Sequence, residues 1–194
     1  MLDLFLFFWV ILILFAIIGA VRGWSKEVIA MAGLILALFA INMFGETLVR
    51  LVAGLGDAPP TDFMAGMREQ FFLLGGILVV IAFFSYQSVQ LLSGRLSGRE
   101  RFQERLLGLI FGAANGYLVV GGLWSLLEFR VGGPEGWTRL PPGVPYVFAP
   151  QITRPISQTP GLELLLTHLP LPWLDPWLPI LIILIFLFLI VAII

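Results

Sequence analysis

Residues 5–18 read FLFFWVILILFAII and residues 179–194 read PILIILIFLFLIVAII, so the chain is apolar on every side near both of its ends. Strands that cross a membrane alternate apolar and polar residues, whereas a membrane-spanning helix can be apolar all round. No water reaches the centre of a bilayer, so a spanning segment must satisfy its own backbone hydrogen bonds, as a helix does. These stretches predict membrane-spanning helices.

Apolar blocks of this kind occupy most of the chain. A hydrocarbon core about 30 Å thick needs about 17–25 helical residues, and each block fits or nearly fits that window. The blocks are Leu2–Val21, Val28–Phe44, Phe71–Leu92, Leu106–Leu127 and Trp177–Ile194. The first block follows an acidic start and is too long for the core of a cleaved signal peptide, so we expect it in the mature protein. The sequence predicts an all-α membrane protein, a bundle of five transmembrane helices.

Composition excludes several classes of protein. Hydrophobic residues make up 59% of the 194 positions, charged residues only 12%, and the mean hydropathy is +1.01, which is not the composition of a water-soluble domain. A formal net charge of −1 gives no electrostatic attraction to nucleic acid. The chain has no cysteine, so it can form no disulfide and no thiolate metal site. The expected surroundings are a lipid bilayer.

Three regions follow from the distribution of prolines and glycines. Residues 1–128 are expected to form a four-helix transmembrane bundle. Residues 129–176 hold most of the 13 prolines, so they cannot be one long helix. Within them, residues 161–169 (GLELLLTHL) have no proline and predict a short helix between Pro160 and Pro170. Residues 177–194 predict an additional C-terminal transmembrane helix.

Basic residues predict the orientation of the chain in the membrane. Six cations gather in two short loops close to the spans, and cytoplasmic loops carry such an excess. They are Arg22, Lys26, Arg95, Arg99, Arg101 and Arg105. We therefore expect the N-terminus outside, the C-terminus in the cytoplasm, and the Pro/Gly-rich segment on the outer face. The last four arginines are also candidates for binding anionic lipid headgroups, or they serve only to set the topology.

Glycines four residues apart mark candidate packing faces. Gly108, Gly112 and Gly116 share one face of the fourth predicted helix, and Gly19 and Gly23 do the same at the end of the first. A helix without Cβ atoms on one face lets another backbone approach closely, which drives association in lipid. The pattern predicts a tight interface within the chain or in a homo-oligomer; ordinary glycine enrichment of membrane helices is the alternative.

Few polar residues fall within the predicted spans. Asn115 lies near the middle of the fourth helix and is expected to face protein, with Gln87 or Tyr86 as its partner. A place in a permeation path is the alternative. His168 is the only histidine, and we expect it at the membrane interface with local hydrogen bonds. Glu128 ends the fourth helix at the same interface, where a carboxylate needs no special role.

Reactive constellations are not recognisable in the sequence. It contains no glycine-rich phosphate loop, no paired intramembrane carboxylates and no Ser/His/Asp arrangement. We therefore predict no catalytic residue, no metal ligand and no cofactor-binding residue. The protein is expected to need no cofactor and not to be an enzyme.

The ordered motifs resemble a known family. Asp3, the turn GAVRGW at 19–24, Glu27, the glycine ladder of 105–116 and the segment 157–170 are similar, in that order, to the CvpA family, the colicin V production proteins. The resemblance covers about residues 1–170. It implies a multi-pass bacterial inner-membrane protein linked to toxin export and envelope maintenance, and it supplies no catalytic residue.

This chain departs from the family pattern in two ways. Asn115 stands where family members often carry a basic residue, and the fifth predicted span is additional to the usual four. The leading hypothesis is a non-enzymatic membrane protein that assists export or envelope homeostasis through helix packing, self-association or other membrane-protein partners. An accessory subunit of a larger, energy-transducing membrane complex and a small transporter or channel are the alternatives, and an intramembrane enzyme ranks last.

Overall fold

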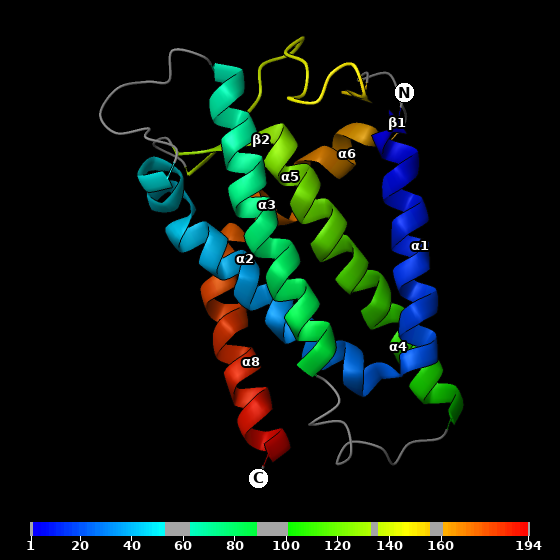
Figure 1. The fold of residues 1–194 in the computed structure, drawn as a ribbon. Coiled ribbons are helices and arrows are strands. Elements are labelled where there is room, and N and C mark those ends of the chain that lie inside the picture. Colours follow the sequence, from blue (N-terminus) through cyan, green and yellow to red (C-terminus); the bar gives the residue numbers. More distant parts are fainter. Residues whose placement is uncertain (1, 53–62, 89–100, 133–135, 156–160, 194) are drawn as a thin grey trace.

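The computed structural model describes residues 2–52, 63–88, 101–132, 136–155 and 161–193 (Figure 1). Within these ranges, five helices are long enough and apolar enough to cross a membrane. They are Leu4–Arg22, Trp24–Val52, Phe63–Gln87, Phe102–Glu128 and Pro170–Phe188. The all-α membrane fold predicted from the apolar blocks is confirmed.

The first two spans are joined by a very short turn. Asp3 caps the start of helix α1 (Leu4–Arg22). Its carboxylate accepts a hydrogen bond of 2.9 Å from the backbone N–H of Phe5. Gly23 has φ +88°, a conformation that a side chain would strain, and it reverses the chain into α2 (Trp24–Val52).

The apolar blocks give the ends of the second and third spans only approximately. Helix α2 continues past the predicted end at Phe44, and an ion pair between Glu46 and Arg50 (2.6 Å) joins successive turns of its exposed extension. Helix α3 (Phe63–Ser88) begins before the predicted start at Phe71. Both extensions contain charged residues, which a search for apolar runs leaves out.

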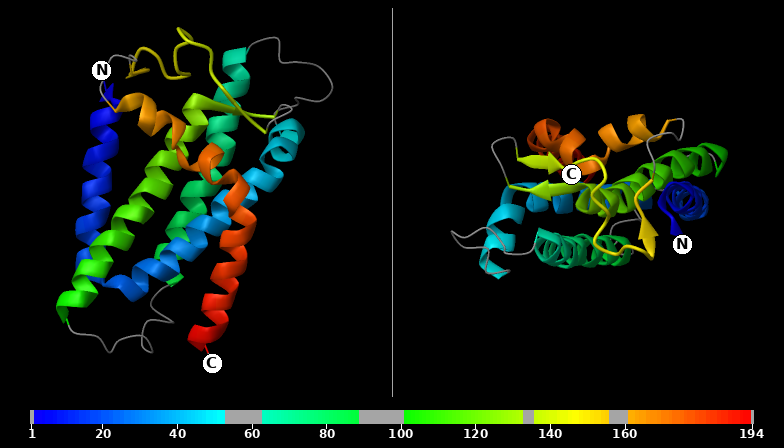
Figure 2. Two further views of the ribbon diagram at one scale, coloured as in Figure 1. Left: turned by 180° about the vertical axis from the view of Figure 1, so that it is seen from behind. Right: turned by 90° about the horizontal axis from the view of Figure 1, so that it is seen from above.

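The fourth span is one continuous helical segment of three parts. It consists of α4 (Arg101–Gly116), the π-helical turn η3 (Tyr117–Gly121) and α5 (Gly122–Glu128). Helix α4 packs closely against α1, whereas α5 packs against α3. Seen from above, α3 and the α6–α8 segment lie on opposite faces of a central layer formed by α2 and the fourth span (Figure 2).

The Pro/Gly-rich segment folds over one end of the bundle. It contains β2 (Phe129–Val131), which pairs antiparallel with β3 (Trp137–Arg139), then β4 (Ile152–Thr153) and α6 (Leu162–Thr167). Strand β4 pairs in parallel with β1 (Leu2–Asp3), so the segment is tied to the start of the chain. These four short strands were not predicted. We call the described residues of 129–169 the platform.

The last span is broken near its start. Helix α7 (Pro170–Leu174) leads from the platform into the bundle, where the N–H of Leu171 donates to Ser125 Oγ (3.3 Å). The short turn η4 (Asp175–Trp177) then connects α7 to α8 (Leu178–Ile193). Helix α8 packs mainly against α2 and is otherwise exposed, and it ends at the face opposite the N-terminus (Figure 1).

A buried aromatic cluster joins the bundle to the platform. Trp124 of α5 packs against Phe8 of α1, and its indole N–H donates to the hydroxyl of Tyr146 (2.9 Å) in the platform. All three side chains are almost completely buried. The platform therefore shares its core with the bundle and does not stand apart from it.

Candidate functional site

The predicted packing glycines lie at the contact between α1 and α4. A Cβ atom on Gly19 would lie 2.7 Å from Gly112 Cα and would overlap the carbonyl oxygen of Gly108. A Cβ on Gly116 would lie 2.8 Å from the Cβ of Phe15. The two backbones therefore touch where side chains are missing. This contact is within one chain; a role of these glycines in self-association stays a prediction.

Gly23, the fifth predicted glycine, has a different neighbour. A Cβ atom at this position would lie 3.1 Å from the carboxylate oxygen Oε1 of Glu104 on α4. Since the backbone at Gly23 also forms the turn between two helices, the residue serves both the turn and the approach of α4.

Glu27 is completely buried between membrane helices. Its carboxylate accepts hydrogen bonds from the guanidinium of Arg22 (2.8 Å), the amide of Asn115 (2.7 Å) and the hydroxyl of Tyr86 (3.1 Å). These residues, which we call the Glu27 cluster, join the end of α1 to α2, α3 and α4. Burying a carboxylate is costly unless it is paired and hydrogen-bonded, and here it is both.

The Glu27 cluster contains the intramembrane residue singled out from the sequence. The amide of Asn115 also donates to the backbone carbonyl of Glu27 (3.0 Å), so it binds α2. Asn115 and Tyr86 both donate to the same carboxylate oxygen of Glu27, so they are indirect neighbours. Gln87, the other residue proposed in the span, is exposed on α3. The burial of Glu27 could not be predicted from the sequence, because this residue follows a polar turn and such turns are usually exposed.

Glu128 is the centre of a second buried cluster, at the platform end of the bundle. Its carboxylate accepts hydrogen bonds from Arg139 Nε (2.8 Å), Arg154 Nη2 (2.6 Å) and the hydroxyl of Tyr146 (2.7 Å). Glu128 ends α5 and is fully buried, and it has a structural role that was not expected from its position in the sequence. Burial and the adjacent carboxylate of Glu128 raise the pKa of the Tyr146 hydroxyl, so this group stays protonated and donates.

Arg154 also holds the irregular backbone of the platform. Its guanidinium donates to the carbonyls of Leu140 (3.0 Å), Pro141 (2.6 Å) and Val144 (3.2 Å). Proline-rich backbone forms few regular hydrogen bonds, so a side chain has to satisfy these carbonyl groups. Arg154 therefore fixes the loop and Glu128 to each other.

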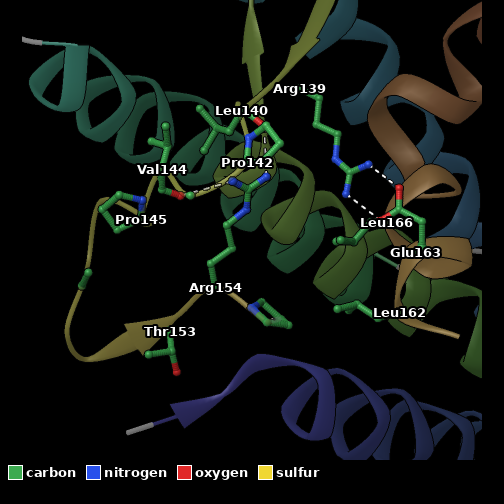
Figure 3. Close-up of a pocket in the computed structure, with 13 residues that line it drawn as sticks. Arg139, Leu140, Pro142, Val144, Pro145, Thr153, Arg154, Leu162, Glu163 and Leu166 are labelled. Atoms are coloured by element: carbon green, nitrogen blue, oxygen red, sulfur yellow. Dashed lines mark hydrogen bonds and ion pairs between the residues drawn. The ribbon is translucent and has the colours of Figure 1, made fainter. Parts of the chain in front are cut away.

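Arg139 links Glu128 to helix α6. Its terminal nitrogens pair with both carboxylate oxygens of Glu163, at 2.5 and 3.1 Å, as the close-up in Figure 3 shows. These bonds raise the pKa of Arg139 and lower that of Glu163. We call Glu128, Arg139, Arg154, Tyr146 and Glu163 together the Glu128 cluster.

A pocket of about 620 Å³ opens beside this cluster (Figure 3). We call it the platform pocket. Most of its wall is apolar and comes from prolines and leucines of the platform, with Arg139, Arg154 and Glu163 on one side. Its apolar lining residues include Leu140, Pro142, Val144, Pro145, Pro155, Leu162 and Leu166.

The remaining predicted residues do not converge on either cluster. Arg95 and Arg99 lie outside the described residues, Arg101 begins α4, and Arg105 is exposed. Lipid binding by these arginines stays a prediction.

His168 makes local bonds at the end of α6. Its Nδ1 atom lies 2.7 Å from the carbonyl oxygen of Leu164 and 3.1 Å from Thr167 Oγ1, and its backbone carbonyl accepts a hydrogen bond from Tyr117. In the part of the chain that the structure describes, no three His, Asp or Glu side chains are placed to hold a metal ion.

The sequence matches one known protein family. The family model described as colicin V production protein matches residues 3–139. The chain belongs to this family. The match begins at the residue that caps α1 and ends at Arg139, so it includes the first four spans and the two strands that follow them. No curated protein and no solved structure matches the chain.

The family match also limits how far the resemblance extends. It includes the glycine ladder and the turn at 19–24, but the segment 157–170, for which a resemblance was expected from the sequence, lies beyond it. The fifth span and most of the platform pocket are beyond the match as well. The family therefore accounts for the bundle and the start of the platform.

Proposed function

We propose that this member of the colicin V production family is a non-enzymatic protein of the bacterial inner membrane that assists toxin export or envelope homeostasis by binding a partner at its platform. The observation that carries the proposal is a platform fixed to the bundle by the buried Glu128 carboxylate and hollowed by a pocket. The volume of about 620 Å³ lies in the range of ligand sites, about 300–1,000 Å³.

The platform is proposed to lie on the outer side of the membrane, with the C-terminus in the cytoplasm. Two observations support this orientation. The N-terminus and the C-terminus lie at opposite ends of the bundle (Figure 1), and Arg22 and Arg105 lie at the end of the bundle away from the platform. Because the chain has no cysteine, single cysteines report sidedness directly. Two exposed glutamines, Gln151 in the platform and Gln103 on α4, form a matched pair.

We expect a membrane-impermeant maleimide to label Gln151→Cys on intact cells and Gln103→Cys only after lysis. The reverse pattern would place the platform in the cytoplasm and overturn the proposed orientation.

Partner binding is tested with a second matched pair, the exposed threonines Thr153 and Thr138. Thr153 lines the platform pocket, whereas Thr138 lies on β3 and is not part of its wall. A photo-crosslinking residue at 153 is expected to capture a defined partner in native membranes, and one at 138 is not. Thr153→Trp should abolish toxin secretion in a complemented deletion strain, whereas Thr138→Trp should preserve both secretion and the product captured from position 153. Normal secretion with Thr153→Trp would overturn the proposal.

Helix α8 favours a second candidate, an accessory subunit of a larger membrane complex. It lies against α2, and its other faces expose large apolar side chains such as Ile183 and Phe186 that another membrane protein could cover. Co-purification from native membranes of the full chain and of a chain ending at Trp177 separates the candidates. Loss of a stable complex only in the truncated chain supports the accessory subunit. Liposome flux that is abolished by Asn115→Leu would instead indicate a transporter.

A further inference from the structure

A second hollow, of about 440 Å³, lies between the strands β2–β3 and the broken start of the last span. We call it the tryptophan groove. Apart from one arginine and one threonine, its wall is aromatic or proline. It is lined by Phe129, Arg139, Thr167, Pro172, Trp173, Pro176 and Trp177.

The position of exposed tryptophans places this groove at a membrane interface. Tryptophan gathers where the acyl chains of a bilayer meet the headgroups. Trp173 in the groove and Trp9 on α1 are each 45% exposed. The two tryptophans lie at similar depths along the bundle. Gly121 lies against both Pro170, which begins the helix of Trp173, and Phe8, which precedes Trp9 on α1.

The groove continues into an exposed apolar face of α8. Below Trp177, helix α8 exposes apolar side chains, among them Ile180 and Leu184. In a protein that crosses a membrane, acyl chains cover such a face. An acyl chain that follows α8 towards the interface reaches the aromatic wall of the groove.

Arg139 is the charged residue in the wall of the groove. The Arg139 side chain is 34% exposed, and its two terminal nitrogens pair with Glu163, which is 58% exposed. Ion pairs between exposed groups contribute little, so another anion can replace Glu163. A guanidinium binds phosphate oxygens in the same two-pronged manner as a carboxylate. Arg139 can keep its hydrogen bond from Nε to Glu128 while its terminal nitrogens bind the other anion.

We propose that the tryptophan groove binds an anionic phospholipid from the leaflet at the platform end. The phosphate lies on the terminal nitrogens of Arg139 in place of Glu163, and one acyl chain packs along Trp173 and Trp177 onto α8. The site does not include Arg95, Arg99, Arg101 or Arg105. It shares Arg139 with the wall of the platform pocket.

The test uses two substitutions that should act in opposite directions. The full chain is purified in mild detergent with phosphatidylglycerol and phosphatidylcholine, and the bound lipid is counted by native mass spectrometry. Arg139→Gln should lower the retained phosphatidylglycerol about fivefold, the effect of one cation near a membrane surface. Glu163→Gln should raise it, because it removes the competing carboxylate. Arg130→Gln is the control, since Arg130 lies on β2 over the ring of Phe63 and outside the groove.

A merely structural role of the Arg139–Glu163 pair gives a different result. Both substitutions break the same ion pair, so they would then change lipid retention in the same direction. That outcome overturns the proposal, as does an effect of Arg139→Gln no larger than that of Arg130→Gln.

The acyl-chain contact is tested by an equally exposed pair of tryptophans. Trp173→Leu should reduce phosphatidylglycerol retention, whereas Trp9→Leu should leave it unchanged. Glycerol phosphate, which has the anion but no acyl chains, should not displace the lipid. Equal effects of the two tryptophan substitutions, or displacement by glycerol phosphate, would exclude a lipid site of this geometry.

Discussion

Two glutamates are fully buried among the residues that the structure describes, and their surroundings differ. Glu27 lies among four membrane helices and pairs with Arg22, only five residues away. Glu128 lies beneath the platform and pairs with Arg139 and Arg154, which follow it by 11 and 26 residues. The first cluster joins helices that already pack through glycines. The second organises a segment that has little regular secondary structure of its own.

This difference indicates where a buried ion pair matters most. Helices satisfy their own backbone groups, and α1 and α4 already touch along Gly19 and Gly112, so the Glu27 cluster adds to an existing contact. In the platform, Arg154 satisfies three backbone carbonyls that lie in a proline-rich loop. The platform should therefore depend on Glu128 more than the bundle depends on Glu27.

The largest effect is expected from Glu128→Gln. The substitution leaves Arg139 and Arg154 partly buried without their shared carboxylate, and breaking a buried pair in this way costs about 3–5 kcal/mol. We expect a loss of this size in the free energy of unfolding in mild detergent, together with protease cleavage within residues 140–155. A protein that keeps both its stability and its protease resistance would contradict the role given to Glu128.

Glu27→Gln should cost less, about 1–3 kcal/mol, the penalty of a buried hydrogen-bonding group left without its partner. Arg22 is 23% exposed and keeps its bond to the carbonyl of Tyr86 (3.1 Å), so its charge is not stranded. The same unfolding measurement checks this value. If Glu27→Gln proved more damaging than Glu128→Gln, the comparison between the clusters would be reversed.

A smaller effect is expected from pH, through the exposed pair of Glu163 and Arg139. Arg139 holds the pKa of Glu163 below its ordinary value, so the ionised carboxylate stabilises the folded state above that value. This contribution, about 0.2–1 kcal/mol for an exposed pair, is lost as the pH falls from about 4.3 through the lowered pKa. The stability difference between wild type and Glu163→Gln should be present at neutral pH and should disappear in strong acid.

The smallest expected effect is the coupling between the two clusters. They share no residue, and they contact the fourth span at different places, one at Asn115 near its middle and the other at Glu128 at its end. The double variant Glu27→Gln/Glu128→Gln should therefore equal the sum of the single losses within about 0.5 kcal/mol. A double-mutant cycle measures this difference. A coupling of several times that size would show that the bundle and the platform unfold as one unit.

The spans could be predicted from sequence because lipid imposes a simple rule, a long apolar run for each crossing. The runs located all five spans but not the charged extension of α2 beyond Phe44. They also gave no sign of β1–β4, because two- and three-residue strands carry too little pattern.

The glycine ladder predicted a packing face on the fourth span, but the glycine spacing does not show which helix packs against it. A face without Cβ atoms accepts any backbone that comes close, and only the folded chain places Gly19 of α1 against Gly108 and Gly112. The Glu128 cluster was missed for a different reason. Arg139 ends a three-residue strand and Arg154 follows a two-residue strand, both too short to show a periodicity. Nothing in their spacing therefore connects them to a glutamate at the end of a helix.

The π-helical turn η3 has a consequence for the whole fourth span. Below it, Gly112 and Gly116 meet α1, whereas directly after it Gly122 lies against Leu78 of α3. One residue more than an α-helical turn needs rotates the upper part of the span by about 100°. Deleting one residue from 117–121 would remove that rotation and swing Glu128 away from its arginines. The fourth span therefore packs against α1 before η3 and against α3 after it, and η3 sets the rotation between these two parts.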